Sequence, residues 1–224
     1  MRRTGFIALI LSLPLAAATI TLPSVNTGFY QVNGVTVATS GYFTGVCAGC
    51  VPVGEYRAYN VFSLTAGLST ITAATLSLPF TGYNSNDPSE TLALFDVTTS
   101  IAALTSGVGS VAIFTDLGTG TILGSVVVPP SAGPTVNVVF NAAGLAYLNS
   151  KIGSSAGLGL ALTSLAFGAT DEALFNNSAK SHPTLTITTN DAGSPTPEPG
   201  TLPLLLCGIG LAVVAGRKVS HTIA

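Results

Sequence analysis

Residues 70–80 have the sequence TITAATLSLPF, in which polar and apolar side chains alternate. Successive side chains of an extended strand point to opposite faces, so Leu76, Leu78 and Phe80 would share one face. The threonine and serine between them would lie on the other face. Residues 183–189, PTLTITT, repeat the pattern. Such alternation predicts β-strands with one buried and one solvated face.

Similar short stretches, rich in β-branched and aromatic residues, recur along the chain between turn signals. The turn signals include residues 82–88 (GYNSNDP), 118–120 (GTG) and 129–134 (PPSAGP). Many short strands with frequent turns predict an all-β fold, an antiparallel β-sandwich or barrel. The strands that we expect are residues 28–38, 56–64, 70–80, 91–98, 111–115, 121–128, 135–140, 158–165 and 183–189.

One stretch departs from the strand pattern. Residues 141–149 have the sequence NAAGLAYLN, in which Asn141 can cap a helix and Leu145 and Leu148 lie one turn apart on one face. Gly144 would destabilise a helix by up to about 1 kcal/mol relative to alanine, which favours a short one. We therefore expect one short helix at the end of a sandwich that spans residues 19–189.

The composition is unusual for a soluble protein. The chain has 224 residues, of which 47% are hydrophobic and 7% charged, and its mean hydropathy is +0.62. Soluble globular proteins have about 25% charged residues. Residues 19–194 hold three basic and eight acidic residues, a net charge of −5. Nucleic-acid binding requires clustered Lys and Arg, so the charge argues against nucleic acid as a partner and predicts a surface of Thr, Ser, Asn and Gly.

The N-terminal sequence MRRTGFIALILSLPLAAA, residues 1–18, has the three parts of a secretory signal peptide. Two arginines precede an apolar run, and small residues follow it, with Ala16 and Ala18 in the A-x-A pattern of a cleavage site. Thr19 would be the first residue of the mature protein. The alternative is a buried N-terminal helix, which the paired arginines argue against.

A second apolar run lies near the C-terminus, where residues 200–216 are GTLPLLLCGIGLAVVAG. A helix needs about 17 to 25 apolar residues to cross a bilayer, so this run is long enough for one span. Arg217 and Lys218 follow directly and favour the cytoplasmic side. This orientation places residues 219–224 inside the cell and the main domain outside, joined by a linker of residues 190–196. The alternative is a buried helix of the domain, which would be expected to have a polar face.

The tripeptide Pro197-Glu198-Pro199 stands directly before this apolar run and the basic pair. This three-part ending, over residues 194–218, resembles the PEP-CTERM sorting domain of exported bacterial proteins. The resemblance implies recognition by an exosortase, a membrane-bound protease or transpeptidase, with the helix as a transient anchor in the inner membrane. Two prolines keep the peptide extended and accessible to such an enzyme. The alternative is a permanent single-span anchor.

Residues 55–64 (EYRAYNVFSL) and 71–78 (ITAATLSL) are similar to the first strands of secreted jelly-roll modules of the DNRLRE type, some of which bind polysaccharides. The resemblance implies a jelly-roll sandwich. Ser63 stands where an aspartate is more usual in that pattern. For Arg57 we expect a packing role, with its side chain lying across Tyr56 or Tyr59 and its head group in water.

Cys47 and Cys50 form a C-x-x-C motif. In an exported protein this motif predicts a structural disulfide, because the compartment is oxidising. A metal site would need further soft ligands, and the domain offers only His182 besides these cysteines. Cys207 lies within the apolar run, where a thiol usually packs as a small hydrophobic group.

The acidic residues fall into two sequence pairs, Asp87 with Glu90 and Asp171 with Glu172. Glycoside hydrolysis uses two carboxyl groups at a set separation across a cleft, which sequence proximity does not establish. Calcium is compatible with such oxygen ligands, but no loop has EF-hand spacing. No nucleophile motif or phosphate-binding loop is present in the sequence, so we predict no catalytic site, no cofactor and no metal.

Together these features predict an exported, non-enzymatic protein of the cell surface or extracellular matrix, with a structural or adhesive role. It would be held first at the inner membrane and then processed by an exosortase-type enzyme. One alternative is a polysaccharide-binding module, which would need exposed aromatic rings; a polysaccharide hydrolase is a further alternative. The candidate aromatic residues for binding are Tyr30, Tyr42, Tyr56, Tyr59 and Tyr83.

Overall fold

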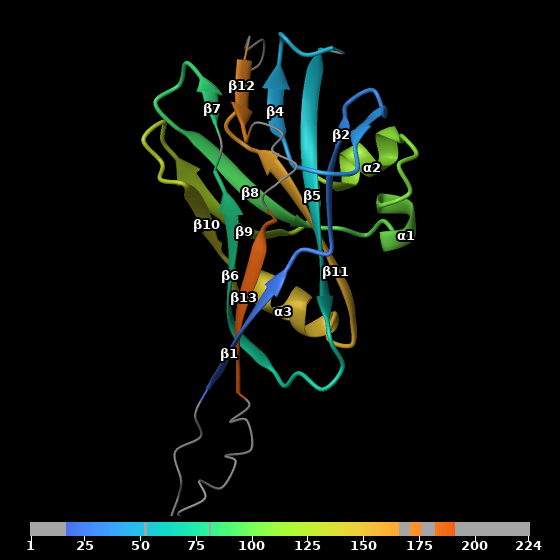
Figure 1. Cartoon of the computed structure of the whole chain (residues 1–224), viewed down its shortest axis with the longest axis vertical. Helices are drawn as coiled ribbons and strands as arrows, with labels where there is room; N and C mark the ends of the chain where they lie inside the picture. Colours follow the sequence, from blue (N-terminus) through green and yellow to red (C-terminus); the bar gives the residue numbers. More distant parts are fainter. Residues whose placement is uncertain (1–16, 52, 81, 166–170, 176–181, 191–224) are drawn as a thin grey trace, which may run out of the picture. The chain divides into compact units, whose positions relative to one another are not determined.

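The alternating segments pair as neighbours in an antiparallel sheet. β6 (Ile71–Pro79) and β13 (Thr184–Thr189) lie side by side, with Leu76 opposite Leu185. β1 (Ala18–Pro23) and β10 (Thr135–Val139) complete this four-stranded sheet in the order β1-β13-β6-β10 (Figure 1). The prediction of strands with one buried face is confirmed here.

A second, nine-stranded antiparallel sheet curls beside the first. Its main path follows the order β7-β12-β4-β5-β11-β8-β9, and β2 pairs with β5 and with β3. The strands of this sheet are β2 (Asn26–Gln31), β3 (Thr36–Ala38), β4 (Thr44–Cys47), β5 (Gly54–Leu64), β7 (Tyr83–Ser85), β8 (Glu90–Asp96), β9 (Ile122–Val128), β11 (Ser154–Leu162) and β12 (Asp171–Leu174). The predicted all-β, sandwich-like architecture is therefore correct.

The structure is a computed structural model that describes residues 17–51, 53–80, 82–165, 171–175 and 182–190. Residues from Ala18 to Asn190 form one compact unit. Among the described helices, none has the length and apolar character required to cross a membrane. The predicted span of residues 200–216 and nearly all of the predicted signal peptide lie outside the described residues.

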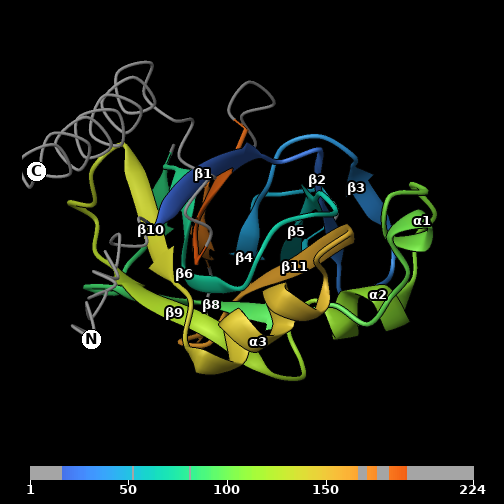
Figure 2. The ribbon, with the colours of Figure 1, turned by 90° about the horizontal axis from the view of Figure 1, so that it is seen from below.

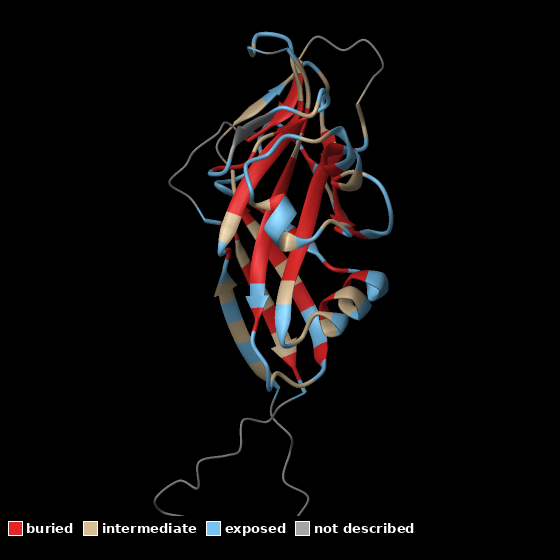
Figure 3. Cartoon of the chain, turned by 90° about the vertical axis from the view of Figure 1, so that its right-hand side faces the viewer, coloured by how far each residue is buried: buried red, intermediate tan, exposed pale blue. Residues whose placement is uncertain are grey.

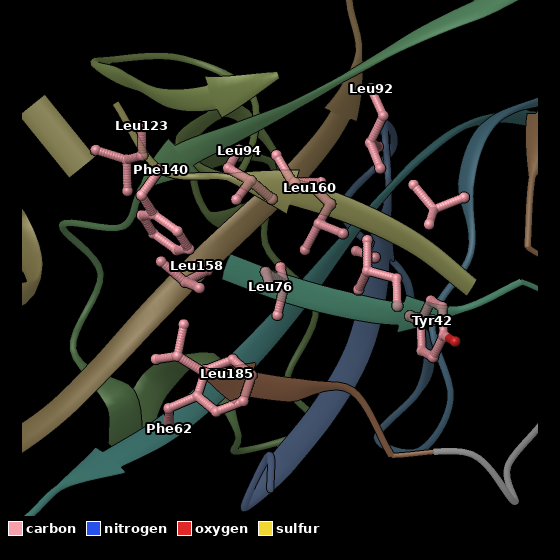
Figure 4. Packing of buried hydrophobic residues seen from close by; sticks show 14 of the residues in the cluster. Tyr42, Phe62, Leu76, Leu92, Leu94, Leu123, Phe140, Leu158, Leu160 and Leu185 are labelled. Atoms are coloured by element: carbon pink, nitrogen blue, oxygen red, sulfur yellow. The ribbon is translucent and has the colours of Figure 1, made fainter. Parts of the chain in front are cut away.

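The main core fills the space between the two sheets. Leu76 and Leu185 of the four-stranded sheet face Leu94, Leu158 and Leu160 of the curled sheet, and all five side chains are completely buried (Figure 4). Buried residues run along the strands, whereas exposed residues lie mostly on helices and loops (Figure 3). Burial of each large apolar side chain contributes about 1.5–3 kcal/mol, so this interface supplies most of the driving force for folding.

The predicted short helix is present as α3 (Ala142–Ser150). The Asn141 side chain accepts a hydrogen bond from the Gly144 amide, so it is the N-cap that the sequence predicted. Gly144 is needed for packing, because a Cβ atom there would lie 2.4 Å from the Leu123 carbonyl oxygen. The Asn149 side chain also bonds both the amide and the carbonyl of Ile71, which holds the helix against β6.

Two further helices were not predicted. α1 (Ile101–Leu104) and α2 (Val111–Asp116) lie on the outer side of the curled sheet, across the domain from β10 (Figure 2). The predicted strand at residues 111–115 is therefore wrong. Ile113, Phe114 and Leu117 form one helical face, and they bury the tyrosines on the outward face of β2 and β5.

The predicted strand at residues 28–38 is also corrected, because it is a hairpin of β2 and β3. Asn33 and Gly34 form the turn, in which Gly34 has a φ of +83° and the Asn33 side chain accepts from the Val35 amide. An Asn-Gly pair is a strong turn signal. Four strands were missed altogether: β1, β4, β7 and β12.

The outward face of the four-stranded sheet carries no charged side chain. Because paired residues share a face, the register places Thr21, Thr186 and Thr75 in one row across β1, β13 and β6. Thr19 and Thr188 form a second row. On β10 the same face carries Asn137 and Val139, both exposed. This threonine face explains how part of a charge-poor domain meets water mainly through hydroxyl groups.

Candidate functional site

Both chain ends of the domain meet in one pair of strands. β1 and β13 pair over all six residues, so that Ala18 lies opposite Thr189. The predicted cleavage site between Ala18 and Thr19 is thus at the first residues of β1. Asn190, the last described residue, follows β13 directly. Ala18 and Asn190, the first and last residues of the domain, therefore lie at the same end of this strand pair (Figure 1).

The residues predicted to direct sorting lie outside the described part of the chain. They are Ala16 of the cleavage motif, Pro197, Glu198 and Pro199 of the tripeptide, and Arg217 and Lys218 of the basic pair. Their roles remain predictions from the sequence.

The predicted disulfide is present. Cys47 is the last residue of β4, and its sulfur is bonded to that of Cys50, with the two Cα atoms 5.4 Å apart. Beside it, a pocket of about 270 Å³ opens between Phe43, Phe175 and Tyr83. Phe175 has a φ of +66°, unusual for a non-glycine residue, and its ring packs against Tyr42 and Phe80. The disulfide closes a short loop at the rim of this aromatic pocket.

The tyrosines do not form the exposed platform that the polysaccharide-binding alternative required. Tyr30, Tyr42, Tyr56 and Tyr59 are each at most 3% exposed, and Tyr83 is half-buried. The Tyr30 hydroxyl donates to the Leu104 carbonyl and that of Tyr59 to Asn26, and burial together with Tyr30 raises the pKa of Tyr59 to about 12. The outward tyrosines are covered because α1 and α2 pack on them.

Three of the four candidate carboxylates converge, although they come from different strands and loops. Oxygen atoms of Asp87, Glu90 and Glu172 lie within 4.8 Å of one another. β12 pairs with β7, which brings Glu172 opposite Ser85 and so beside the turn that carries Asp87. The Ser85 hydroxyl donates to Glu90 at 2.6 Å, and the Ser164 hydroxyl donates to the other oxygen of Glu90.

The fourth carboxylate, Asp171, lies apart from this cluster. Its side chain accepts a hydrogen bond from the Ala48 amide at 2.7 Å and so supports the disulfide loop.

The chemistry of the acidic cluster is that of an oxygen-ligand set, which suits hard cations such as calcium. It does not suit glycoside hydrolysis. The carboxyl groups lie about as close together as the two catalytic carboxyl groups of retaining glycosidases, which are roughly 5 Å apart. However, Glu90 is completely buried and Glu172 is only 6% exposed. A sugar ring could not reach carboxylates held in this way without movement of the surrounding strands.

A more polar pocket lies where α3 meets the end of β8 and the start of α1. It has a volume of about 280 Å³ and is lined by Asp96, Lys151, Tyr147 and several serine and threonine residues, including Ser155. The Lys151 ammonium lies 5.2 Å from the centroid of the Tyr147 ring. The Tyr147 hydroxyl donates to the Gly157 carbonyl, and burial raises its pKa to about 12, so the phenol is neutral at physiological pH.

No sequence motif pointed to this polar pocket, because its residues come from three separate segments of the chain. The one available signal was Lys151, a basic residue in a domain that has few. The pocket offers hydroxyl donors and acceptors, one carboxylate and one ammonium group. These groups could bind a small polyhydroxylated ligand.

Arg57 has a packing role, as expected, but against a different partner. Its guanidinium lies 4.2 Å from the centroid of the Phe114 ring and donates to the carbonyl oxygens of Phe114 and Thr115. It also forms an ion pair with Glu55 at 2.8 Å. Tyr56 cannot be its partner, because adjacent residues of a strand face opposite sides. Arg57 therefore joins the end of α2 to β5.

Comparison with protein-family models and with curated protein sequences gives no match for this chain.

Proposed function

We propose that the protein is an exported, non-enzymatic component of the cell surface or extracellular matrix, sorted through its C-terminal tail. The observation that carries this proposal is the order Pro197-Glu198-Pro199, apolar residues 200–216, Arg217 and Lys218 at the end of the chain. This order resembles a PEP-CTERM tail, whose processing enzyme would be of the exosortase type. The domain itself we assign to the jelly-roll type of sandwich.

The number of residues between the last strand and the tripeptide supports this function. The last described strand ends at Thr189, and the tripeptide begins eight residues later in the sequence, after Ser194 and Pro195. A processing enzyme at the membrane surface needs an extended substrate segment that is free of the folded domain. The two prolines of the tripeptide favour such an extended conformation.

The chemistry of the domain supports export. The Cys47–Cys50 disulfide is typical of proteins in oxidising compartments. The uncharged threonine face lacks the lysines and arginines that would bind phosphate groups, which supports a function without nucleic acid.

A structural role accounts for the described residues better than catalysis does. In the one group of three carboxylates found among the described residues, Glu90 and Glu172 are buried and Asp87 is half-buried. Both oxygens of Glu90 accept hydrogen bonds from serine hydroxyls, those of Ser85 and Ser164. We therefore assign no cofactor and no reaction to the domain.

The sorting function is tested by replacing Pro197 and Pro199 with alanine in a bacterium that carries an exosortase-type enzyme. We expect the full-length double variant to accumulate in the inner membrane, while the unchanged protein reaches the surface or medium without its tail. Pro195→Ala is the matched control, since it alters a neighbouring proline outside the tripeptide. Intact-mass analysis would identify both ends of each product.

Two outcomes would contradict the proposal. If the double variant and the control were released equally, the tripeptide would not be the recognition element. If the unchanged protein kept its tail in the membrane in the presence of the enzyme, the segment would be a permanent anchor.

A second function, binding of extracellular polysaccharide, is favoured by the polar pocket beside α3. Its hydroxyl groups, Lys151 and the Tyr147 ring are groups that bind sugars in proteins. We expect Lys151→Ala to reduce the affinity for oligosaccharides of the host polysaccharide in calorimetric titrations. The control is Thr135→Ala, which alters an exposed residue of the four-stranded sheet. Equal affinities for the unchanged protein and both variants, or no binding by any of them, would reject this function.

A further inference from the structure

The edge strands of the two sheets differ in how they are protected from pairing with another chain. An edge strand has a row of backbone N–H and C=O groups without partners in its sheet. β3 and β7 are three residues long. The edge strands β9 and β10 protect each other, because they lie close together. A Cβ atom on Gly124 of β9 would be only 2.5 Å from the carbonyl oxygen of Val139 in β10, and the Asn141 amide donates a hydrogen bond to the Leu123 carbonyl nearby. Among the described residues, β1 is the edge without such protection.

The sequence of β1 lacks the features by which edge strands usually avoid association. Natural edges carry charges, bulges or prolines within the strand. β1 is ATITLP, with no charge and a single proline at its end, and its register with β13 has no bulge. Thr19 and Thr21 are exposed, whereas Ile20 and Leu22 are half-buried. Alternating threonine and β-branched or aliphatic residues have a high propensity for strand pairing.

We propose that β1 pairs in antiparallel orientation with β1 of a second copy of this chain, so that the four-stranded sheet continues through both copies. A strand paired with itself about a two-fold axis is self-complementary by symmetry. The electrostatics agree, because β1 has no charged residue and the adjacent outward side chains of β13 are Thr184, Thr186 and Thr188. No like charges would meet across the new contact.

The contact would be small. A strand of six residues is about 20 Å long, so the interface would be below the size of stable complexes and weak between isolated copies. Copies concentrated on two opposed surfaces would pair much more strongly, because each further contact between the surfaces occurs at a high effective concentration.

The geometry of this pairing also determines where the two chain ends of each domain would lie. Both ends of the domain leave beside Ala18 and Thr189. In an antiparallel β1–β1 pair, these ends of the two copies lie at opposite ends of the shared strands. Such pairing favours copies on two opposed surfaces, or copies released from the membrane, over neighbours in one membrane. This inference does not depend on how the tail is processed.

The test measures self-association of the full chain, purified in detergent from an exporting host, by sedimentation over a range of concentrations. We expect a reversible dimer for the unchanged chain. Thr21→Lys places two ammonium groups near each other at the shared edge and should weaken the dimer at least tenfold. Thr135→Lys is the matched control, an exposed threonine on β10 of the same sheet, and should dimerise normally.

A mixed experiment separates edge pairing from other causes. Thr21→Lys and Thr21→Glu copies, each weak alone, should recover the dimer when combined, because opposite charges then meet. A monomer at all concentrations for the unchanged chain would overturn the proposal. A dimer equally stable in Thr21→Lys would also overturn it and would point to association through the apolar C-terminal segment.

Discussion

The outward face of the four-stranded sheet and the outward face of β2 and β5 meet water in different ways. The first carries rows of threonines such as Thr21 and Thr186 and is not covered by any described helix. The second carries Tyr30 and Tyr59, and the segment with α1 and α2 covers it. A chain with few charges can thus either use hydroxyl groups on a sheet or bury an apolar face under inserted helices.

The difference also determines which residues are sensitive to substitution. On the threonine face the side chains are exposed or half-buried, so no single side chain is essential. On the covered face, a few groups hold two short helices, which are too short to be stable alone. Substitutions of equal size should therefore have unequal effects on the two faces.

The largest effect is expected for Phe114→Ala. Phe114 is 4% exposed, packs among the covered tyrosines and lies beneath the Arg57 guanidinium. Removing a buried aromatic side chain leaves a cavity and costs about 3–5 kcal/mol of unfolding free energy. Urea denaturation of the full chain would measure the loss. A change below 1 kcal/mol would mean that α2 contributes little to the fold.

A smaller loss is expected for Arg57→Ala, which removes the contact with Phe114 and the hydrogen bonds to the end of α2. A partly buried cation–π contact with charged hydrogen bonds contributes about 1–2 kcal/mol. Arg57→Lys keeps the charge but not the planar group, so it should recover only part of this loss. Full recovery by lysine would show that the charge alone matters.

The next prediction concerns pH. The Asp116 carboxylate accepts hydrogen bonds from Thr98 and Thr99. Partial burial alone would raise the pKa of Asp116, but these bonds outweigh it, so the pKa lies below its ordinary value. A lowered pKa stabilises the fold above the unfolded-state pKa, and this stabilisation is lost as the pH falls through the folded-state pKa.

Asp116→Asn should therefore cost about 1 kcal/mol near neutral pH. The difference between the two proteins should begin to shrink as the pH falls below the ordinary aspartate pKa of about 4, where the unfolded chain takes up the proton first. It should vanish once the pH is also below the lowered pKa of the native carboxyl group. Thermal unfolding measured from pH 7 down to pH 3 would show this convergence. A difference independent of pH would contradict the assigned role of the carboxylate.

The smallest effect is expected on the threonine face. Thr186→Val keeps the β-branched shape and loses a hydroxyl contact of 3.3 Å with Thr21. The unfolding free energy should change by less than about 0.5 kcal/mol. A loss comparable to that of Phe114→Ala, under the same denaturation conditions, would remove the distinction between the two faces.

The strands of the main core were predictable because burial on one face leaves an alternating sequence, as in β6 and β13. The N-cap of α3 was predictable because capping depends on a local side chain, that of Asn141. β1 was missed, although Thr19 to Leu22 alternate, because so short a run directly after the predicted cleavage site is weak evidence for a strand.

The covering helices and the acidic cluster could not be predicted from local sequence. A window as short as residues 111–115 contains β-branched residues and fits strand and helix equally well. The meeting of Asp87 and Glu172 depends on β7 pairing with β12, two short strands far apart in the sequence. Tyr59 was a candidate for an exposed binding ring, because no local pattern shows that a later segment covers it.

The position of β13 has a mechanical consequence. β13 is bonded to β1 on one side and to β6 on the other, and the chain that leads to the tail leaves from its end. If the C-terminal tail is held fixed and another part of the domain is pulled away from it, the force acts along the axis of β13. Antiparallel hydrogen bonds lie perpendicular to the strands, so both ladders are loaded in shear, and their bonds must break together rather than one after another.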